Sequence, residues 1–79
     1  MTEGKIKLDT VEKVKNFSNM IGKIDGDYDI SSTKGKYCID AKSIMGIFSL
    51  DLSSPLLLTN ADHTELDPAV VEIIKQFEA

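Results

Sequence analysis

The chain has 79 residues, and its nine lysines, thirteen acidic residues and lack of arginine give a formal net charge of −4 at pH 7. This length fits one domain over residues 1–79 with a core of modest size. The acidic balance argues against direct nucleic-acid binding, because that affinity depends on cations that neutralise phosphates, and no apolar run approaches the roughly 20 residues of a membrane span.

The first third of the chain predicts a strand and then a helix. Polar and apolar residues alternate over 4–8, which is typical of a strand with one buried face. Asp9 or Thr10 can cap the helix, and Glu12 is placed to complete a capping box with Asp9. Gly22 is a natural end. The apolar stripe predicted to face the core consists of Val11, Val14, Phe17, Ser18 and Ile21.

The next segment predicts an antiparallel hairpin. Residues 28–32 alternate, with Tyr28 and Ile30 on one face, and 33–36 form a turn in which Gly35 supplies a positive φ. The alternation then resumes. The residues expected on the buried face after the turn are Tyr37, Ile39 and Ala41.

A short helix is predicted to begin at or just after Ser43. Ile44, Ile47 and Phe48 fall at i, i+3 and i+4, which is helical spacing. The Ser43 hydroxyl can accept a hydrogen bond from an amide of the first turn. Met45 need not point inward with the other apolar residues, and a flexible thioether left outside is suited to docking.

The last third predicts a strand over 56–59, a polar loop over 61–66 and a final helix. Asp67 caps that helix and Pro68 begins it. The apolar stripe of this helix consists of Val70, Ile73, Ile74 and Phe77.

The predicted order is therefore β-α-β-β-α-β-α. Alternating strands and one-sided helices predict an α+β fold, in which three helices cover one face of a four-stranded antiparallel sheet. The other face is expected to be open to water. The residues expected there are Lys5, Lys7, Asp29, Ser31, Cys38 and Asp40.

Cysteine and histidine each occur once, as Cys38 and His63. One cysteine excludes an intramolecular disulfide, and no leader-like segment opens the chain, so we expect a cytoplasmic protein. The pair does not make a metal-binding motif, and no phosphate-cradling glycine loop is present, so we expect no metal and no cofactor. The Cys38 thiol has no cationic neighbour that would activate it.

The stretch Ser43-Ile44-Met45-Gly46, with Lys42 before it and Ser49-Leu50 after it, resembles the regulatory-serine helix of HPr, the histidine-containing phosphocarrier protein of the bacterial sugar phosphotransferase system. The likeness is close over about a dozen residues and extends to the rest of the chain in pattern and element order. It implies the open-faced β-sandwich of HPr-like proteins.

The carrier chemistry of that family is missing from this sequence. HPr-like proteins carry the phosphoacceptor histidine at the start of the first helix, followed by Ala, Arg and Pro. The corresponding residues here are Asp9-Thr10-Val11-Glu12-Lys13, so two carboxylates stand where a phosphate needs positive charge. Thr10 is a poor phosphoacceptor without a base beside it. We therefore expect no histidine phosphocarrier activity, no catalytic residue and no enzyme.

The regulatory part of the resemblance is retained. In Gram-positive members of the family, the serine matching Ser43 is phosphorylated by an ATP-dependent kinase, and the modified protein docks on a transcriptional regulator of carbon use. The resemblance thus implies a regulatory phosphorylation site at Ser43 and a protein-docking surface at Ile44, Met45 and Phe48. A phosphate there would add negative charge to an apolar surface, with Lys42 available to screen it. The same residues also fit a plain helix cap and core.

Two other functions stay open at this level. An atypical phosphocarrier would use His63, with Asp62 and Glu65 beside it, or a histidine of a partner protein. A small-molecule-binding module would have an α+β sandwich of similar form, with dimerisation through its open sheet face. The sequence does not specify an oligomeric state.

Overall fold

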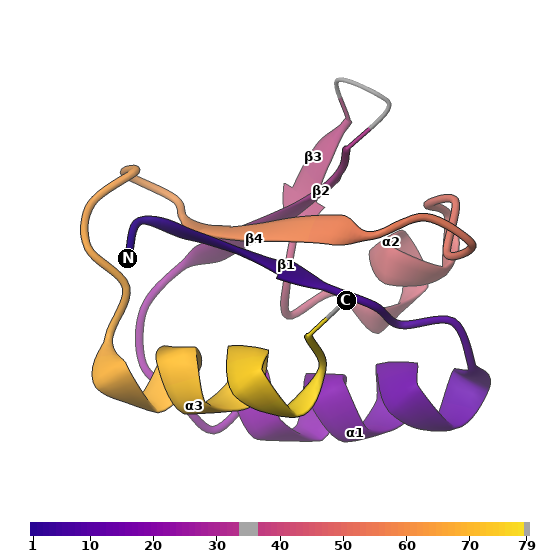
Figure 1. Cartoon of the computed structure of the whole chain (residues 1–79), viewed down its shortest axis with the longest axis horizontal. Helices are drawn as coiled ribbons and strands as arrows, with labels where there is room; N and C mark the ends of the chain where they lie inside the picture. The colour runs from indigo at the N-terminus through magenta and orange to yellow at the C-terminus, as the bar shows by residue number, and fades with distance from the viewer. Residues whose placement is uncertain (34–36, 79) are drawn as a thin grey trace.

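The element order predicted from the sequence is present in the computed structural model, which describes residues 1–33 and 37–78. The elements are β1 (Glu3–Ile6), α1 (Val11–Ile21), β2 (Tyr28–Ser32), β3 (Cys38–Asp40), α2 (Ile44–Phe48), β4 (Leu56–Asn60) and α3 (Pro68–Gln76) (Figure 1). The turn predicted around Gly35 lies outside the described residues. The α+β class is confirmed.

The four strands form one antiparallel sheet in the order β1-β4-β2-β3. In its register, Leu58 of β4 lies between Gly4 of β1 and Ile30 of β2. These three residues are buried, whereas Leu57 and Thr59 on the same strand are partly exposed. The period of two therefore divides the sheet into a covered face and an open face, as the alternation predicted.

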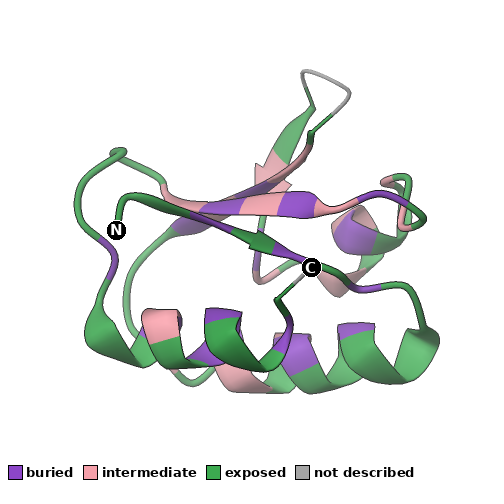
Figure 2. Ribbon diagram, in the orientation of Figure 1, coloured by how far each residue is buried: buried purple, intermediate pink, exposed green. Residues whose placement is uncertain are grey.

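The three helices cover one face of the sheet, and their buried sides point toward it (Figure 2). Residues of all three helices and of the covered sheet face form one hydrophobic cluster. Phe17 of α1 meets Phe77 edge to face, with ring centroids 5.9 Å apart. Helix α3 packs closely on β1. A Cβ atom at Gly4 would stand only 2.6 Å from Ile74 Cδ1 of this helix. The absence of a side chain at Gly4 therefore lets Ile74 approach β1 this closely.

Two residues expected in the core are exposed. The Val11 side chain is 57% exposed because Val11 is the first residue of α1, and the buried residues of this helix begin one turn later, at Val14. Tyr37 is 76% exposed because it precedes β3, which begins only at Cys38, so the strand alternation does not extend to it. The predicted burial of both side chains was wrong.

The start and end of α1 also differ from the prediction. Thr10 is the N-cap and accepts a hydrogen bond from the Lys13 amide, so Asp9 and Glu12 do not form a capping box. Gly22 follows the last turn as predicted, but its φ of −64° is right-handed, so it does not form a left-handed cap. In the described part of the chain, helices long and apolar enough to cross a membrane are absent.

Candidate functional site

Helix α2 begins at Ser43, as the sequence predicted. Ser43 has extended backbone angles, and its Oγ accepts a hydrogen bond from the Gly46 amide at 3.2 Å. A Cβ atom at Gly46 would lie 3.0 Å from Ile39 Cδ1 and 3.1 Å from Ser43 Oγ. Glycine therefore lets this short helix lie close to β3 while leaving space for the serine. Ser43 itself is exposed, so its hydroxyl is accessible from solvent.

The apolar residues of α2 divide between the core and the surface. Ile47 is fully buried, and Ile44 is partly buried against the core. The Met45 side chain is 77% exposed and the Phe48 side chain is 39% exposed. The outward direction of Met45 is confirmed. Of the three expected docking residues, two are surface residues, and we call Met45 and Phe48 the α2 patch.

Lys42 does not point freely toward Ser43. Its Nζ donates a hydrogen bond to the Ile24 carbonyl oxygen at 2.6 Å, which ties it to the segment after α1. Its backbone amide donates to Asp40 Oδ1 at 2.9 Å. The expected screening of charge at Ser43 is therefore absent from this arrangement, because the ammonium group already has a partner.

The start of α1, which the resemblance to HPr-like proteins aligns with the carrier histidine, holds groups that bond to each other. Thr10 Oγ1 accepts from the Lys13 amide at 3.1 Å, and Lys13 Nζ donates to Asp9 Oδ1 at 2.9 Å. The hydrogen bond from Lys13 is the main cause that lowers the pKa of Asp9 below its ordinary value. The Lys13 cation is thus paired with a carboxylate, which offsets its charge at the start of α1.

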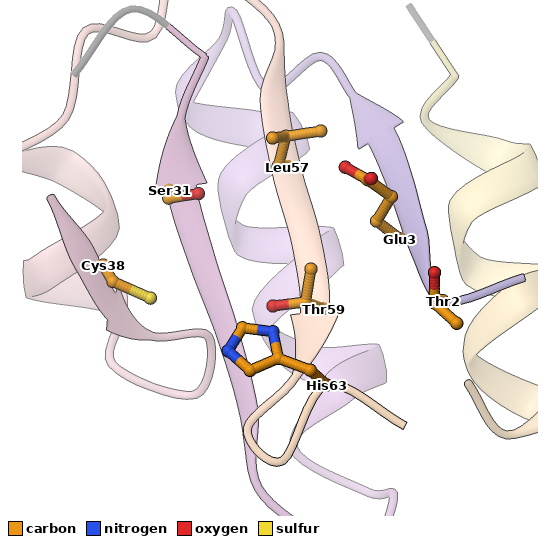
Figure 3. A pocket seen from close by; sticks show the side chains of 7 residues that line it. All are labelled: Thr2, Glu3, Ser31, Cys38, Leu57, Thr59 and His63. Atoms are coloured by element: carbon orange, nitrogen blue, oxygen red, sulfur yellow. The ribbon is translucent and has the colours of Figure 1, made fainter. Parts of the chain in front are cut away.

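A hollow of about 300 Å³ lies on the open face of the sheet, and we call it the open-face hollow. Residues of all four strands and of the loop between β4 and α3 line it (Figure 3). The side chains that line it are Thr2, Glu3, Ser31, Cys38, Leu57, Thr59 and His63. His63 belongs to the predicted polar loop over 61–66 and is exposed, but its imidazole reaches over the sheet in the direction of Cys38.

The loop that carries His63 is held by its own side chains. Asp62 Oδ1 accepts from the Thr64 amide at 3.1 Å and from Thr64 Oγ1 at 2.6 Å. The amide group of Asn60 donates to Thr64 Oγ1 and to the Glu65 carbonyl oxygen. His63 has a φ of 59°, in the left-handed region that residues with a Cβ atom seldom adopt. This backbone turn directs the imidazole toward the sheet.

Cys38 lies on the open face as the sequence predicted, and its thiol is not activated. Partial burial raises the pKa of the thiol, and the negative charge of Asp29 and a hydrogen bond to its carboxylate raise it further. The thiol therefore stays protonated and is a weak nucleophile at neutral pH. Within residues 1–33 and 37–78, clusters of three or more potential metal ligands are absent.

The predicted site residues thus fall into separate places. Ser43 and the α2 patch share one short helix, Asp9 and Thr10 begin α1, and His63 lies at the open-face hollow. Strand alternation placed Ser31 and Cys38 on that face, but no local signal placed His63 beside them. No protein-family model and no curated protein matches this chain.

Proposed function

We propose that the chain is an HPr-like protein that lacks carrier chemistry and acts as a regulatory, protein-docking module, with Ser43 as its phosphorylation site. One observation carries this proposal: an exposed serine caps a helix whose second residue, Met45, and last residue, Phe48, present apolar side chains to solvent. The element order and the open four-stranded sheet support the family resemblance.

The α2 patch has the chemistry of a docking surface. An exposed methionine next to an exposed aromatic ring offers large apolar area, and the thioether adapts to differently shaped partners. The patch is supported from beneath, since Ile47 is buried and Ile44 packs partly against the core. A partner can therefore bury Met45 and Phe48 without a rearrangement of the helix. The family resemblance makes a serine kinase and a transcriptional regulator of carbon use the expected partners.

Phosphorylation of Ser43 would change this surface strongly. A phosphoserine carries about −1.5 to −2 charges at neutral pH. This charge would appear within one helical turn of the α2 patch, where Lys42 is bound to the Ile24 carbonyl oxygen. The added charge would then repel a partner that prefers the bare apolar surface and recruit one that also supplies cations. Ser43 would in this way select between partners.

The start of α1 supports the absence of carrier function. Thr10 is engaged as a helix cap, and Lys13 is paired with Asp9. A phosphoryl group on this helix would therefore meet a neutralised cation and the additional carboxylate of Glu12. Regulation without phosphate carriage is the function that agrees best with these contacts.

Intact mass after two parallel incubations tests the proposal. We expect ATP with an HPr serine kinase to add one phosphate, and phosphoenolpyruvate with the first enzyme of the sugar system to add none. Ser43→Asn is the informative variant, because asparagine caps helices as well as serine but has no hydroxyl. It should take no phosphate. Ser49→Ala is the matched control, since Ser49 lies just after the same helix and also bonds to Gly46, and it should be phosphorylated normally.

Two results would contradict the proposal. Kinase treatment that leaves the mass unchanged, or phosphate that remains in Ser43→Asn, would reduce Ser43 to a structural cap. Phosphate transferred from phosphoenolpyruvate and lost in His63→Ala would instead identify an atypical phosphocarrier that uses His63.

A further inference from the structure

The open-face hollow lies on the opposite side of the sheet from the three helices, and the proposed function rests on none of its lining residues. Its volume of about 300 Å³ is at the lower end of small-molecule sites and much larger than a metal ion. Leu57 supplies an apolar part of its lining, and polar side chains surround it. Apolar atoms make up most of the surface that lines the hollow, and several polar groups converge on it, which is the composition of a small-molecule site.

The polar groups of the hollow are ready to accept hydrogen bonds. Among the described residues, the carboxylate of Glu3, the hydroxyl of Thr59 and the imidazole of His63 have no side-chain hydrogen bond or ion pair. Each of these groups can accept from an N–H donor. The loop bonds of Asp62 and Thr64 hold His63 over the sheet, so its ring is positioned before any ligand arrives.

The charge around the hollow is negative. The strand register places Glu3 opposite Thr59, Thr59 opposite Asp29, and Asp29 opposite Asp40 in one row across the sheet. Among the described residues that line the hollow, Glu3 carries a charged carboxylate and none is a lysine. Lys5 lies in the next row, opposite Leu57. An anion would meet unfavourable charge here, whereas a cation would be attracted.

We infer that the open-face hollow binds a small organic cation that carries an ammonium or guanidinium group. Glu3 forms the ion pair with the cationic group, Thr59 and His63 accept further N–H hydrogen bonds, and Leu57 contacts the aliphatic part of the ligand. A charge-assisted bond from such a group to a carboxylate is the strongest contact available in this set. This site is independent of Ser43 and the α2 patch.

Amide chemical shifts of the ¹⁵N-labelled chain, titrated with agmatine, test the inference, because agmatine carries both cationic groups on one aliphatic chain. We expect saturable shifts centred on Glu3, Thr59 and His63. Glu3→Gln should weaken binding about tenfold or more, since it removes the charge of the ion pair. Glu12→Gln is the matched control. It removes the same charge from exposed α1, on the covered side of the sheet, and should change the affinity less than about twofold.

Several results of the agmatine titration would contradict the inference. Shifts that do not saturate, equal weakening by Glu3→Gln and Glu12→Gln, or shifts spread over the whole acidic surface would show general charge attraction and overturn the inference. Tighter binding of glutarate, a dianion of similar length, at the same residues would overturn the assigned charge. His63→Ala, with a normally dispersed spectrum, should weaken agmatine binding and leave phosphorylation of Ser43 unchanged.

Discussion

The two faces of the sheet differ in what they contribute, and neighbouring residues of β4 show the difference most directly. Leu58 is fully buried beneath the helices, whereas Leu57, the next residue back, lies partly exposed in the open-face hollow. The covered face therefore holds the fold together and the open face is available for recognition. Because the core and the open-face hollow use opposite sides of the same strands, a residue on one face can be substituted with little effect on the other face.

The largest expected effect is a difference in stability between Leu58→Ala and Leu57→Ala. The first substitution leaves a cavity in the core and should reduce the free energy of unfolding by roughly 2–5 kcal/mol. The second removes a partly exposed side chain and should reduce it by less than about 1 kcal/mol. Urea unfolding followed by circular dichroism measures both. Equal losses would show that the open face is covered in solution, and a dependence on protein concentration would then identify self-association.

Gly4→Ala and Lys5→Ala provide a second pair across the two faces, with a smaller effect. The new Cβ atom at position 4 would stand 2.6 Å from Ile74 Cδ1 and 2.9 Å from Ile74 Cγ2 and would push α3 away from β1. We expect a loss of about 1–3 kcal/mol in the free energy of unfolding. Lys5→Ala, on the open face, should change it by no more than about 0.5 kcal/mol. A neutral Gly4→Ala would contradict the close contact between α3 and β1.

The smallest effect concerns the pH dependence of the loop that holds His63. Hydrogen bonds from the Thr64 side chain and amide lower the pKa of Asp62 from its ordinary value of 3.8. Because the pKa is lower in the folded chain, the Asp62 contribution to stability is fully present above 3.8 and is lost as the pH falls through the folded value. Thr64→Val removes the side-chain bond and should raise the pKa of Asp62 toward 3.8.

A carboxyl-carbon NMR titration of wild type and Thr64→Val checks this expectation. Asp9 is the internal control, because its pKa is lowered by Lys13 of α1 and not by Thr64, so it should stay unchanged. An Asp62 pKa that does not move in Thr64→Val would mean that the Thr64 hydroxyl does not hold the His63 loop.

Much of the fold could be predicted from the sequence because its signals are local. Alternation predicted the bounds of β2 at Tyr28 and Ser32, and the caps at Ser43 and Asp67 were read from the residues that begin each helix. Helical spacing also predicted that Ile47 faces the core while Met45 does not. These features depend on residues within one turn or one strand of each other, so short patterns contain the information.

The errors in predicted burial occurred where a pattern was extended to the first residue of its element or just beyond it. Val11 and Tyr37 fit the periods of α1 and β3, but both stand at a terminus, where the period no longer determines which way a side chain points. The expectation that Lys42 is available to screen charge at Ser43 was wrong for a different reason. Its partner, the Ile24 carbonyl oxygen, is 18 residues away in the sequence, and only the folded chain brings the two together.

By itself, the sequence determined the element order, the capped start of α2 and the division of the sheet into a buried and a polar face. Only the tertiary structure decided the strand order, the contact of α3 with Gly4 and the open-face hollow. The hollow combines strands distant in the sequence with His63, whose direction depends on one left-handed φ in a hydrogen-bonded loop. Periodicity describes a face of one element, whereas a site between several elements depends on their register and on the loops that join them.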